Sequence, residues 1–501
     1  MNYFIGVDLG TTSTKAVLFE ENGEIKASEN IYYKLHRDNL GMAEQEPEEI
    51  FQAFLTAIHS LSKQITDDDK LLVVSFSSAM HSLIAFDKDW QPLTRVITWA
   101  DTRAVKYTEK LKKEGIGKEI YLKTGTPIHP MAPLSKLLWL KNEHSEVFEK
   151  AEHYLGVKEY VFHRLFGSNK MDLSLATGTS LFNIFQLDWD EQALEVASVR
   201  REQLPIVVEP YEIEKGMKKH YAAQMNIPID TPFVYGAADG ALSNLGVNAV
   251  APGVAAITIG TSGAIRVVSK QPLVDKKART FTYALDKEHW VIGGSVNNGG
   301  DVFRWLKDGL FEEETFNSLA TIAGGVEAGS DGLLFLPYLN GERAPLWDAN
   351  ARGSFFGLTY AHTREQMIRA VLEGITFNLY AVAQSLEEVV GKITTIQATG
   401  GFTRSEVWTQ MMADIFEQTI TMPESYESGA LAAMTMGKKA IGLIDDLSEI
   451  SQMIGAVKTK YPQQENQEIY RELSALFNKL SWKLTDEYRV ISDIQRKYTN
   501  K

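Results

Sequence analysis

The chain has no cysteine among its 501 residues. That absence excludes disulfides, thiolate metal sites and cysteine nucleophiles, and it fits a reducing compartment. The sequence also lacks an apolar run long enough to span a bilayer, and it lacks a basic segment followed by an apolar segment of the signal-peptide type. We therefore expect a cytoplasmic protein with no membrane partner.

Positive charge is in the minority, because 51 Lys and Arg residues face 65 Asp and Glu residues and the net charge is −14. This balance argues against general nucleic-acid binding but not against one small anionic ligand. Two nucleotide-binding patterns are also missing: the P-loop sequence and a Gly-x-Gly-x-x-Gly run after a strand. A nucleotide, if one binds, must use another kind of turn.

The most informative segment that is present lies at residues 5–17, IGVDLGTTSTKAV. An apolar strand contains one carboxylate, Asp8, and leads through the turn Gly10-Thr11-Thr12-Ser13 into a second apolar strand with Lys15. A lone Asp in such a strand is costly to bury without a partner, for which a metal ion or its waters are suited. The turn offers backbone N–H groups and hydroxyls for phosphate oxygens. An ordinary β-hairpin with a Gly turn is the alternative.

A second hairpin at residues 255–266, AAITIGTSGAIR, repeats the strand, the Gly-Thr-Ser turn and the return strand. Gly10 and Gly260 are separated by half the length of the chain. Two such hairpins, each near the beginning of a half, predict a duplicated α/β fold in which two phosphate-binding turns face one cleft. We expect domains at residues 1–246 and 247–501.

Strands alternate with helices in both halves. In the first half we expect strands at 3–8, 15–19, 25–33, 71–77, 84–87 and 94–99, with a helix at 47–62. In the second half we expect strands at 254–259, 263–269, 280–285, 290–294 and 395–398, with helices at 301–310, 363–386 and 405–417. The charged tail from residue 463 to residue 501 is predicted to be one surface helix.

Three further groups have residue types suited to chemistry. Asp239, in the small-residue run 236–241, could accept a proton from a substrate hydroxyl during phosphoryl transfer, although a helix N-cap is the better interpretation from local sequence alone. The turn Gly400-Gly401 precedes a helix and allows close approach of a ligand, or is a simple strand-to-helix turn.

The third group follows strands on the predicted substrate side. Met80-His81 comes after one strand, and Trp99, Asp101 and Arg103 come at the end of another. Such side chains offer donors and acceptors for a polyol and positive charge for a carboxylate, whereas a surface ion pair is the ordinary interpretation of Asp-x-Arg. His129 lies between two prolines and is either a substrate contact or a loop residue.

At this point the sequence resembles the FGGY family of carbohydrate kinases. Residues 131–143, MAPLSKLLWLKNE, match the family's first signature, and residues 353–373 match the second. The resemblance covers essentially the whole chain. It implies two ribonuclease-H-like domains of the actin/hexokinase-like ATPase type with a catalytic cleft between them, and ATP and Mg²⁺ as cosubstrate and metal.

The resemblance also assigns roles. Asp239 matches the catalytic base and Asp8 the Mg²⁺-associated carboxylate. The predicted ATP-binding residues, from the family positions and the turns together, are Gly10, Thr11, Thr12, Ser13, Lys15, Gly260, Thr261, Gly300, Gly400, Gly401 and Ser405, the last being Asn in relatives. The predicted substrate-binding residues are Met80, His81, Trp99, Asp101, Arg103, His129 and Asp239.

The pattern around residues 77–82, 126–133 and 238–240 is most similar to the gluconate kinases of the family. This implies transfer of the γ-phosphoryl group of ATP to D-gluconate, with His81, Arg103 and His129 as candidate partners of its carboxylate. A kinase for a ketose such as xylulose or ribulose is the alternative within the family. An actin- or chaperone-like ATPase and a non-catalytic sugar sensor are alternatives from other classes, and a homodimer is left open.

Overall fold

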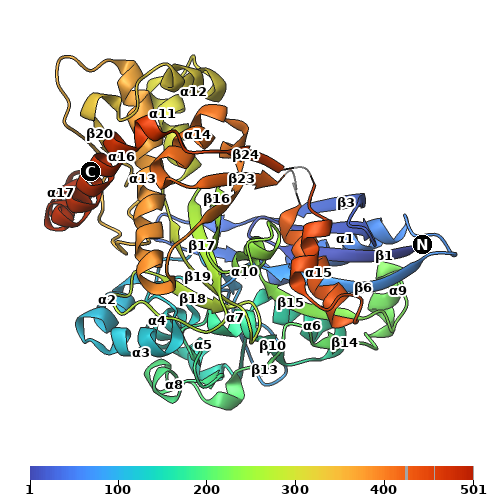
Figure 1. The fold of residues 1–501 in the computed structure, drawn as a ribbon. Helices are drawn as coiled ribbons and strands as arrows, with labels where there is room; N and C mark the ends of the chain where they lie inside the picture. Colours follow the sequence, from blue (N-terminus) through green and yellow to red (C-terminus); the bar gives the residue numbers. More distant parts are fainter. Residues whose placement is uncertain (424–426, 456, 500–501) are drawn as a thin grey trace. The chain divides into compact units, whose positions relative to one another are not determined.

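The computed structural model describes residues 1–423, 427–455 and 457–499, which form two compact units. The first unit comprises Met1–Val250, Ser269–Val291 and Ser425–Ile454, and the second comprises Ala251–Val268, Ile292–Glu424 and Gly455–Lys501. Each unit is described by itself (Figure 1). The functional domains at residues 1–246 and 247–501 stay a prediction.

The first unit is built on a six-stranded sheet of order β14-β15-β6-β1-β2-β3. Its strands are β14 (Ile213–Glu214), β15 (Phe233–Ala238), β6 (Lys70–Ser78), β1 (Asn2–Leu9), β2 (Ser13–Glu20) and β3 (Ile25–Tyr32). Strands β1, β6 and β15 are parallel neighbours, whereas β1, β2 and β3 form an antiparallel meander. Three parallel strands therefore present their carboxyl ends at the same edge of the sheet.

Helices and short strands surround this sheet. The helices are α1 (Pro47–Ser62), α2 (Val105–Lys113), α3 (Ile116–Thr124), α4 (Pro133–Glu143), α5 (Ser145–Lys150), α6 (Val157–Phe166), α7 (Leu173–Thr177), α8 (Glu191–Ala197), α9 (Lys219–Met225), α10 (Asp239–Leu245) and α15 (Ser428–Ala440). The short strands include β5 (Ala43–Gln45), β7 (Ile84–Phe86), β8 (Val96–Ile97), β9 (His153–Leu155), β10 (Lys170–Asp172) and β13 (Ile206–Val208).

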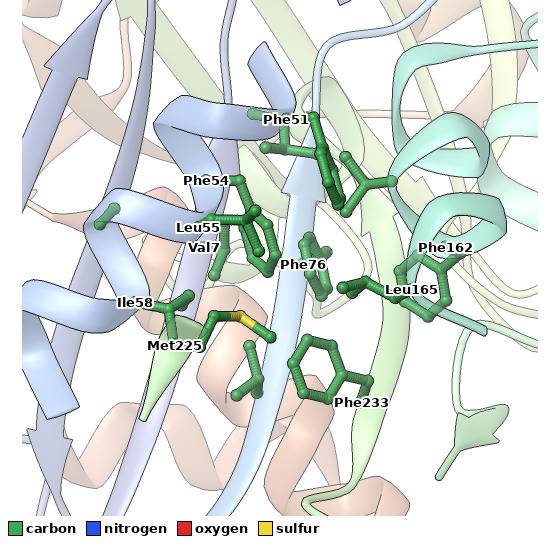
Figure 2. Close-up of a cluster of buried hydrophobic side chains, with 14 of the residues drawn as sticks. Val7, Phe51, Phe54, Leu55, Ile58, Phe76, Phe162, Leu165, Met225 and Phe233 are labelled. Carbon is green, nitrogen blue, oxygen red and sulfur yellow. The ribbon is translucent and has the colours of Figure 1, made fainter. Parts of the chain in front are cut away.

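An aromatic core packs α1 and α6 against one face of this sheet. Figure 2 shows Phe51 and Phe54 of α1, Phe76 of β6, Phe162 of α6 and Phe233 of β15 around one cluster. The rings of Phe76 and Phe162 meet edge to face with centroids 5.1 Å apart. Burial of such large apolar side chains is the main stabilising term of the fold, at about 1.5–3 kcal/mol each. The core therefore fixes β6 and β15, the strands that lead to the predicted substrate side.

The second unit repeats the same strand order. Six strands of a seven-stranded sheet follow the order β19-β17-β16-β22-β23-β24, with β16 (Val254–Ile259) antiparallel to β17 (Gly263–Ser269) and parallel to β22 (Thr395–Gly400). The remaining strands are β19 (Trp290–Val296), β23 (Thr419–Pro423) and β24 (Val457–Lys460). Strands β16 and β22 correspond in order to β1 and β6 of the first unit. This repeat confirms the predicted α/β fold with two similarly built halves.

The helices of the second unit are α11 (Gly300–Leu310), α12 (Phe316–Gly324), α13 (Arg364–Val390), α14 (Glu406–Phe416), α16 (Gln464–Lys483) and α17 (Thr485–Thr499). Most predicted boundaries agree within two or three residues, and α1 matches in full. The tail is different, because it forms two helices rather than one. Leu484, with φ −91° and ψ 10°, ends α16, and Tyr488 of α17 then packs its ring edge to face against Tyr338.

Among the described residues, no helix combines the length and apolarity that crossing a membrane requires.

Candidate active site

The carboxyl ends of β1, β6 and β15 bring three predicted groups to one edge of the first sheet. Asp8 of β1 lies opposite Ser77 of β6, and Ala238 at the end of β15 lies opposite Ser78. Met80-His81 follows β6 directly, and Asp239 follows β15 directly. In α/β sheets this edge is where ligands bind, so the sheet topology gathers metal, substrate and base candidates in one place.

Asp8 is the predicted metal-associated carboxylate. Its Oδ1 accepts a 2.8 Å hydrogen bond from the Ser77 hydroxyl, and burial raises its pKa despite that bond. Gly429 of α15 faces this carboxylate, and a Cβ there would stand 3.9 Å from Asp8 Oδ2. The missing side chain leaves the second oxygen with space beside it. A buried carboxylate next to such space is suited to a cation or its waters.

The turn after Asp8 is fixed through its carbonyl oxygens. Tyr33 donates its hydroxyl proton to the Gly10 carbonyl at 2.6 Å, and the Gln45 side chain donates to the Thr11 carbonyl at 2.6 Å. Thr12 at the tip is exposed. With its carbonyls bound by the protein, the turn keeps a defined shape, which suits a preformed phosphate site. Lys15, predicted as an ATP contact, forms an ion pair with Glu427 at 2.5 Å.

Asp239 is exposed and is the first residue of α10. The N-cap position belongs to Ala238, so the carboxylate is not the cap that local sequence favoured. Asp239 Oδ1 accepts a 2.6 Å hydrogen bond from the Gly240 N–H. A substrate hydroxyl can approach an exposed carboxylate, as a proton acceptor requires.

The strand before Asp239 is shaped by Gly236. Its φ is +62°, and a Cβ built there would stand 1.8 Å from the Phe76 carbonyl oxygen of β6. The ladder between β15 and β6 is irregular at this point, between Val234 and Ala237. The small residues of this run therefore serve close strand packing, and no side chain larger than hydrogen fits at Gly236.

A buried polar chain that the sequence gave no reason to expect supports the same segment. Lys158 of α6 pairs with Asp172 at 2.7 Å, and both side chains are 0% exposed. Asp172 caps α7 through the Leu175 N–H, and Ser174 of α7 accepts a 3.1 Å hydrogen bond from the Ala238 N–H. The pair is thus connected to the residue before Asp239. Single Lys and Asp residues far apart in sequence give no signal of such a pair.

His81 and Met80 form the first part of the predicted substrate side. His81 has φ +66°, and its Nδ1–H donates a 2.7 Å hydrogen bond to the Gly178 carbonyl. Met80 is buried against Gly178, where a Cβ would stand 2.6 Å from the Met80 methyl group. The bond to Gly178 places the proton on Nδ1 and orients the ring.

Lys136 is a supporting residue that the sequence analysis quoted within the first signature without assigning a role. This buried side chain donates to the carbonyl oxygens of His81 and of Ile97, the latter at 3.1 Å. Burial lowers its pKa to about 7. Lys136 therefore joins the segment after β6 to β8, the strand that leads to Trp99. The available signal was a charged residue within the mostly apolar first half of α4.

Asp101 is buried and Arg103 is half-buried, so their ion pair is not an ordinary surface pair. Asp101 accepts hydrogen bonds from Arg103 Nη2 at 2.7 Å and Nε at 2.9 Å and from the Ala43 N–H at 3.0 Å. Arg103 also pairs with Glu44 at 2.5 Å and lies 4.0 Å over the ring of Trp139. Two carboxylates thus surround one guanidinium. The pair's main visible effect is to fix the loop after β8.

Trp99 connects the predicted substrate side to the phosphate turn, because its indole N–H donates a 2.8 Å hydrogen bond to the Thr11 hydroxyl. His129, in the loop before α4, accepts a 3.2 Å hydrogen bond from the Met131 N–H at Nδ1. In neutral His129 the proton therefore lies on Nε2, which makes that atom a donor. His81 and His129 thus have opposite tautomers.

In the second unit, Gly260, Thr261 and Gly300 meet at the end of β16. The Gly300 N–H donates to the Gly260 carbonyl at 2.7 Å, and the Asp301 N–H donates to the Thr261 carbonyl at 3.1 Å. A Cβ on Gly300 would stand 2.6 Å from the Gly260 oxygen. The hairpin turn and the N-terminus of α11 therefore lie side by side and are joined by these two hydrogen bonds.

Gly400 and Gly401 lie beside that turn, because Gly400 of β22 is the register partner of Ile259. Gly400 has φ +104°, and a Cβ there would stand 2.2 Å from the Ile259 carbonyl oxygen, whereas a Cβ on Gly401 would meet nothing within 4 Å. Gly400 is therefore required by the sheet, and Gly401 leaves open space. Ser405 caps α14 by accepting from the Trp408 N–H at 3.2 Å.

Glu342 was missed by the sequence analysis. This buried carboxylate accepts hydrogen bonds from the Asn297 N–H, from Asn298 Nδ2 and from Asn378 Nδ2, at 2.5–2.9 Å. Burial raises its pKa, and these bonds oppose that change. Glu342 thus fixes the segment that leads into Gly300. In the part of the chain that the structure describes, no cluster of three or more His, Asp or Glu side chains could bind a metal by itself.

Comparison with known proteins supports the two-part organisation. The model of the FGGY family of carbohydrate kinases, N-terminal domain, matches residues 3–246, and that of the C-terminal domain matches residues 255–440. A gluconokinase of Bacillus subtilis (strain 168) is 50% identical over 99% of this chain and 98% of its own.

Solved structures agree in fold. A gluconate kinase from Lactobacillus acidophilus has a TM-score of 0.95 and is 43% identical, over 98% of this chain and 99% of its own. A structure described as ligand-bound xylulose kinase from the same organism has a TM-score of 0.96 and is also 43% identical, over 98% of this chain and 100% of its own. With both family models and a full-length relative matched, the chain belongs to the FGGY family of carbohydrate kinases.

Proposed function

We propose that the chain transfers the γ-phosphoryl group of ATP to D-gluconate and releases 6-phosphogluconate. The observation that supports this proposal most is the full-length relationship, at 50% identity, to a protein described as a gluconokinase. The same substrate is named for a structural relative at 43% identity. The arrangement at the ends of β1, β6 and β15 supplies the chemistry that such a transfer requires.

In the proposed reaction Asp239 accepts the proton of the attacking hydroxyl. The carboxylate is exposed at the end of β15, and its strand is fixed against β6 by Gly236. A general base of this kind contributes about 100-fold to 10,000-fold in rate. Phosphoryl transfer otherwise depends on positioning and on neutralising charge, which are tasks for the two turns.

Mg²⁺ fits the surroundings of Asp8. Mg²⁺ in kinase sites takes one or two protein carboxylates, with phosphate oxygens and waters as its other ligands, so a single buried carboxylate with space beside Gly429 is sufficient. When bound, the ion would neutralise charge on the phosphate oxygens. Ser77 would keep the Asp8 carboxylate oriented through its 2.8 Å hydrogen bond.

For ATP we propose the turn at Gly10–Ser13 in the first unit and the glycine-lined end of β16 and β22 in the second. Among the proposed ATP-binding residues, Ser405 has the least support as a contact of the adenine ring, because its hydroxyl already caps α14. Lys15 would reach a phosphate only by leaving Glu427.

The substrate carboxylate distinguishes gluconate from a ketose, and the three candidate partners differ. Arg103 is surrounded by Asp101 and Glu44, so its positive charge is already balanced. His81 uses Nδ1 on Gly178, whereas His129 has Nε2–H as a donor. We therefore favour the two histidines over Arg103 as carboxylate partners, with His129 tested first and Arg103 as a support for the loop.

A ketose kinase is the second candidate, because one structure with a TM-score of 0.96 is described as a xylulose kinase. The experiment is a purified-enzyme assay with ATP, Mg²⁺ and gluconate, xylulose, ribulose or glycerol in turn. The proposal predicts the highest kcat/KM for gluconate by at least tenfold. A higher kcat/KM for xylulose would contradict it, and rapid ATP hydrolysis that no sugar stimulates would indicate a different class of ATPase.

His129→Gln provides a sharper version of the assay. Glutamine keeps hydrogen-bonding capacity but lacks the ring whose Nδ1 accepts from the Met131 N–H and so orients Nε2–H, and the KM for gluconate should therefore rise about tenfold. The KM for ATP should change less than twofold. We also propose a cytoplasmic location, because ATP is the cosubstrate. The proposed partners are small molecules, namely ATP and the sugar acid.

A further inference from the structure

Thr177 is the last residue of α7, the short helix whose Ser174 supports the segment before Asp239, and it is 0% exposed. Its hydroxyl donates a 2.9 Å hydrogen bond to the Ser174 carbonyl and accepts a 3.0 Å hydrogen bond from the Ala284 N–H. Its own carbonyl accepts a 2.6 Å hydrogen bond from the Thr126 hydroxyl. One buried residue therefore joins three segments of the first unit that are far apart in sequence.

The segment that contains Thr177 reaches His81 through Gly178, the next residue. The Gly178 carbonyl accepts the 2.7 Å hydrogen bond from His81 Nδ1–H that fixes the tautomer of this histidine. A Cβ on Gly178 would stand 2.6 Å from the Met80 methyl group and 3.4 Å from His81 Cε1, so the ring lies directly against this backbone. The position of Gly178 therefore determines the position and the tautomer of the His81 ring.

A second segment leads from Thr177 to His129. Thr126, whose hydroxyl binds the Thr177 carbonyl, is 0% exposed and lies just before His129 in the same loop. Gly125, the residue before Thr126, accepts a 2.9 Å hydrogen bond from the Thr282 N–H. The loop that contains His129 is thus held by buried hydrogen bonds at two consecutive residues.

Strand β18 (Phe281–Ala284) connects the two histidine segments. It belongs to the stretch Ser269–Val291 of the first unit and packs against α7 (Figure 1). The N–H groups that bind Gly125 and Thr177 both come from this strand. Tyr283 lies between them in sequence, and its ring meets that of His81 edge to face, with centroids 5.7 Å apart. The strand therefore contacts His81 itself as well as the supports of both histidines.

We propose that Thr177 is a positioning residue for the substrate carboxylate, because it holds His81 and His129 in one fixed arrangement. This inference rests on the proposed function and adds to it the residue that supports both candidate carboxylate partners. Thr177 is fully buried, so it acts through the histidines and not by contact with the sugar acid. Donors that are ordered before the substrate arrives lose less side-chain entropy on binding, which strengthens the binding of the carboxylate.

The first test removes the Thr177 hydroxyl and keeps the shape of the side chain. Thr177→Val leaves the buried Ala284 N–H without its acceptor, so α7 and β18 should shift against each other. With ATP, Mg²⁺ and gluconate, the KM for gluconate should rise about tenfold, while kcat falls less than about threefold and the KM for ATP changes less than about twofold. Thr177→Ser keeps the hydroxyl and should have the KM of the wild-type enzyme for gluconate.

Two further variants separate positioning from the general cost of losing a buried hydroxyl. Thr231→Val is the matched control, because Thr231 is a buried threonine of the same unit whose hydroxyl donates to the Pro228 carbonyl of its own turn at 2.8 Å. It should leave the KM for gluconate unchanged. Thr126→Val breaks the connection to the His129 loop and should raise the KM for gluconate about threefold, less than Thr177→Val does.

A second measurement does not depend on the substrate. Nuclear magnetic resonance of protein labelled with nitrogen-15 histidine, at about pH 8.5, reports which ring nitrogen of His81 bears the proton. His81→Gln identifies its signals among those of the ten histidines. The wild-type protein should have the proton of His81 on Nδ1. Thr177→Val should show a mixture of both tautomers, whereas Thr126→Val should retain the Nδ1 tautomer.

Three results would overturn the inference. The first is an unchanged KM for gluconate in a Thr177→Val enzyme whose circular dichroism equals that of the wild-type protein. The second is an equal rise in the KM for ATP, which would indicate a general structural role. The third is a His81 tautomer that Thr177→Val leaves unaltered. A wild-type enzyme that does not phosphorylate gluconate would refute the proposed function instead, and the tautomer measurement would still decide whether Thr177 positions His81.

Discussion

The buried pair of Lys158 and Asp172 allows a quantitative prediction. Both side chains are 0% exposed and their charged atoms are 2.7 Å apart. Replacing one member of such a pair leaves an uncompensated buried charge, which costs about 3–5 kcal/mol. For a unit of this size 1 kcal/mol lowers the melting temperature by about 2 °C. Lys158→Met should therefore lower the melting temperature of the first unit by about 6–10 °C.

A second variant separates the lost pair from the leftover charge. Asp172→Asn keeps an oxygen that accepts from the Leu175 N–H and so preserves the cap of α7. The double variant Lys158→Met/Asp172→Asn removes both charges, and it should recover at least half of the lost melting temperature. Differential scanning calorimetry on the three variants measures this. A double variant that melts no higher than Lys158→Met would refute the reasoning.

The pair should also affect catalysis through α7. Ser174 accepts the Ala238 N–H, and Asp239 is the next residue. Ser174→Ala leaves that buried N–H without its acceptor, which costs about 1–3 kcal/mol. At 20 °C, where the protein stays folded, we expect Ser174→Ala to lower kcat about tenfold and to leave the KM for ATP within twofold. A fall in kcat no larger than the loss of folded protein measured by circular dichroism would indicate unfolding rather than displacement of Asp239.

The other predictions concern pH, the second sheet and the substrate side. Burial raises the pKa of Glu159 to about 7, so in the folded state it binds a proton between about pH 4.5 and 7 that the unfolded chain has lost. The free energy of unfolding of the wild-type protein should therefore fall by about 3 kcal/mol as pH rises through that window. Glu159→Gln should remove this part of the pH dependence in thermal unfolding measured at pH 5–8. The same pH dependence in both proteins would contradict the raised pKa. Gly400→Ala should raise the KM for ATP and lower the melting temperature, because its Cβ would clash with the neighbouring strand. Gly401→Ala has open space around the new Cβ and should change only the KM for ATP. Equal melting temperatures of the two variants would count against this prediction. Lys136→Met should raise the KM for gluconate about tenfold by releasing the His81 carbonyl, with the KM for ATP as the internal control.

Local patterns were sufficient to predict much of the fold. Helix α1 begins at Pro47 and ends at Ser62 as its sequence indicates, because proline fits the first helical turn and the apolar positions repeat at helical spacing. The two glycine hairpins were also found, since alternating apolar strands around a Gly turn are a strong short-range signal. The tail was wrong as a single helix, because the break at Leu484 depends on how Tyr488 packs against Tyr338.

The site shows the same division between local and distant information. Asp8 and the ends of β6 and β15 were identified from residues near each strand end. The groups that hold them in place were not, because Lys158, Asp172 and Glu342 act across distances in sequence that no local pattern encodes. The sequence indicated only the pairing of Arg103 with Asp101, two residues before it. The second carboxylate that balances the charge of Arg103, Glu44, is brought close only by the fold.

The most direct measurement is the turnover of Asp239→Asn. Asparagine keeps an oxygen for the Gly240 N–H, so α10 should still begin at the same residue, but it cannot accept the substrate proton. With ATP, Mg²⁺ and gluconate, kcat should fall about 100-fold to 10,000-fold while the dissociation constant of ATP stays within about twofold. Asp230→Asn, an exposed carboxylate of the same unit, is the control and should retain full activity. An Asp239→Asn enzyme that phosphorylates gluconate at the wild-type rate would contradict the assignment of the base.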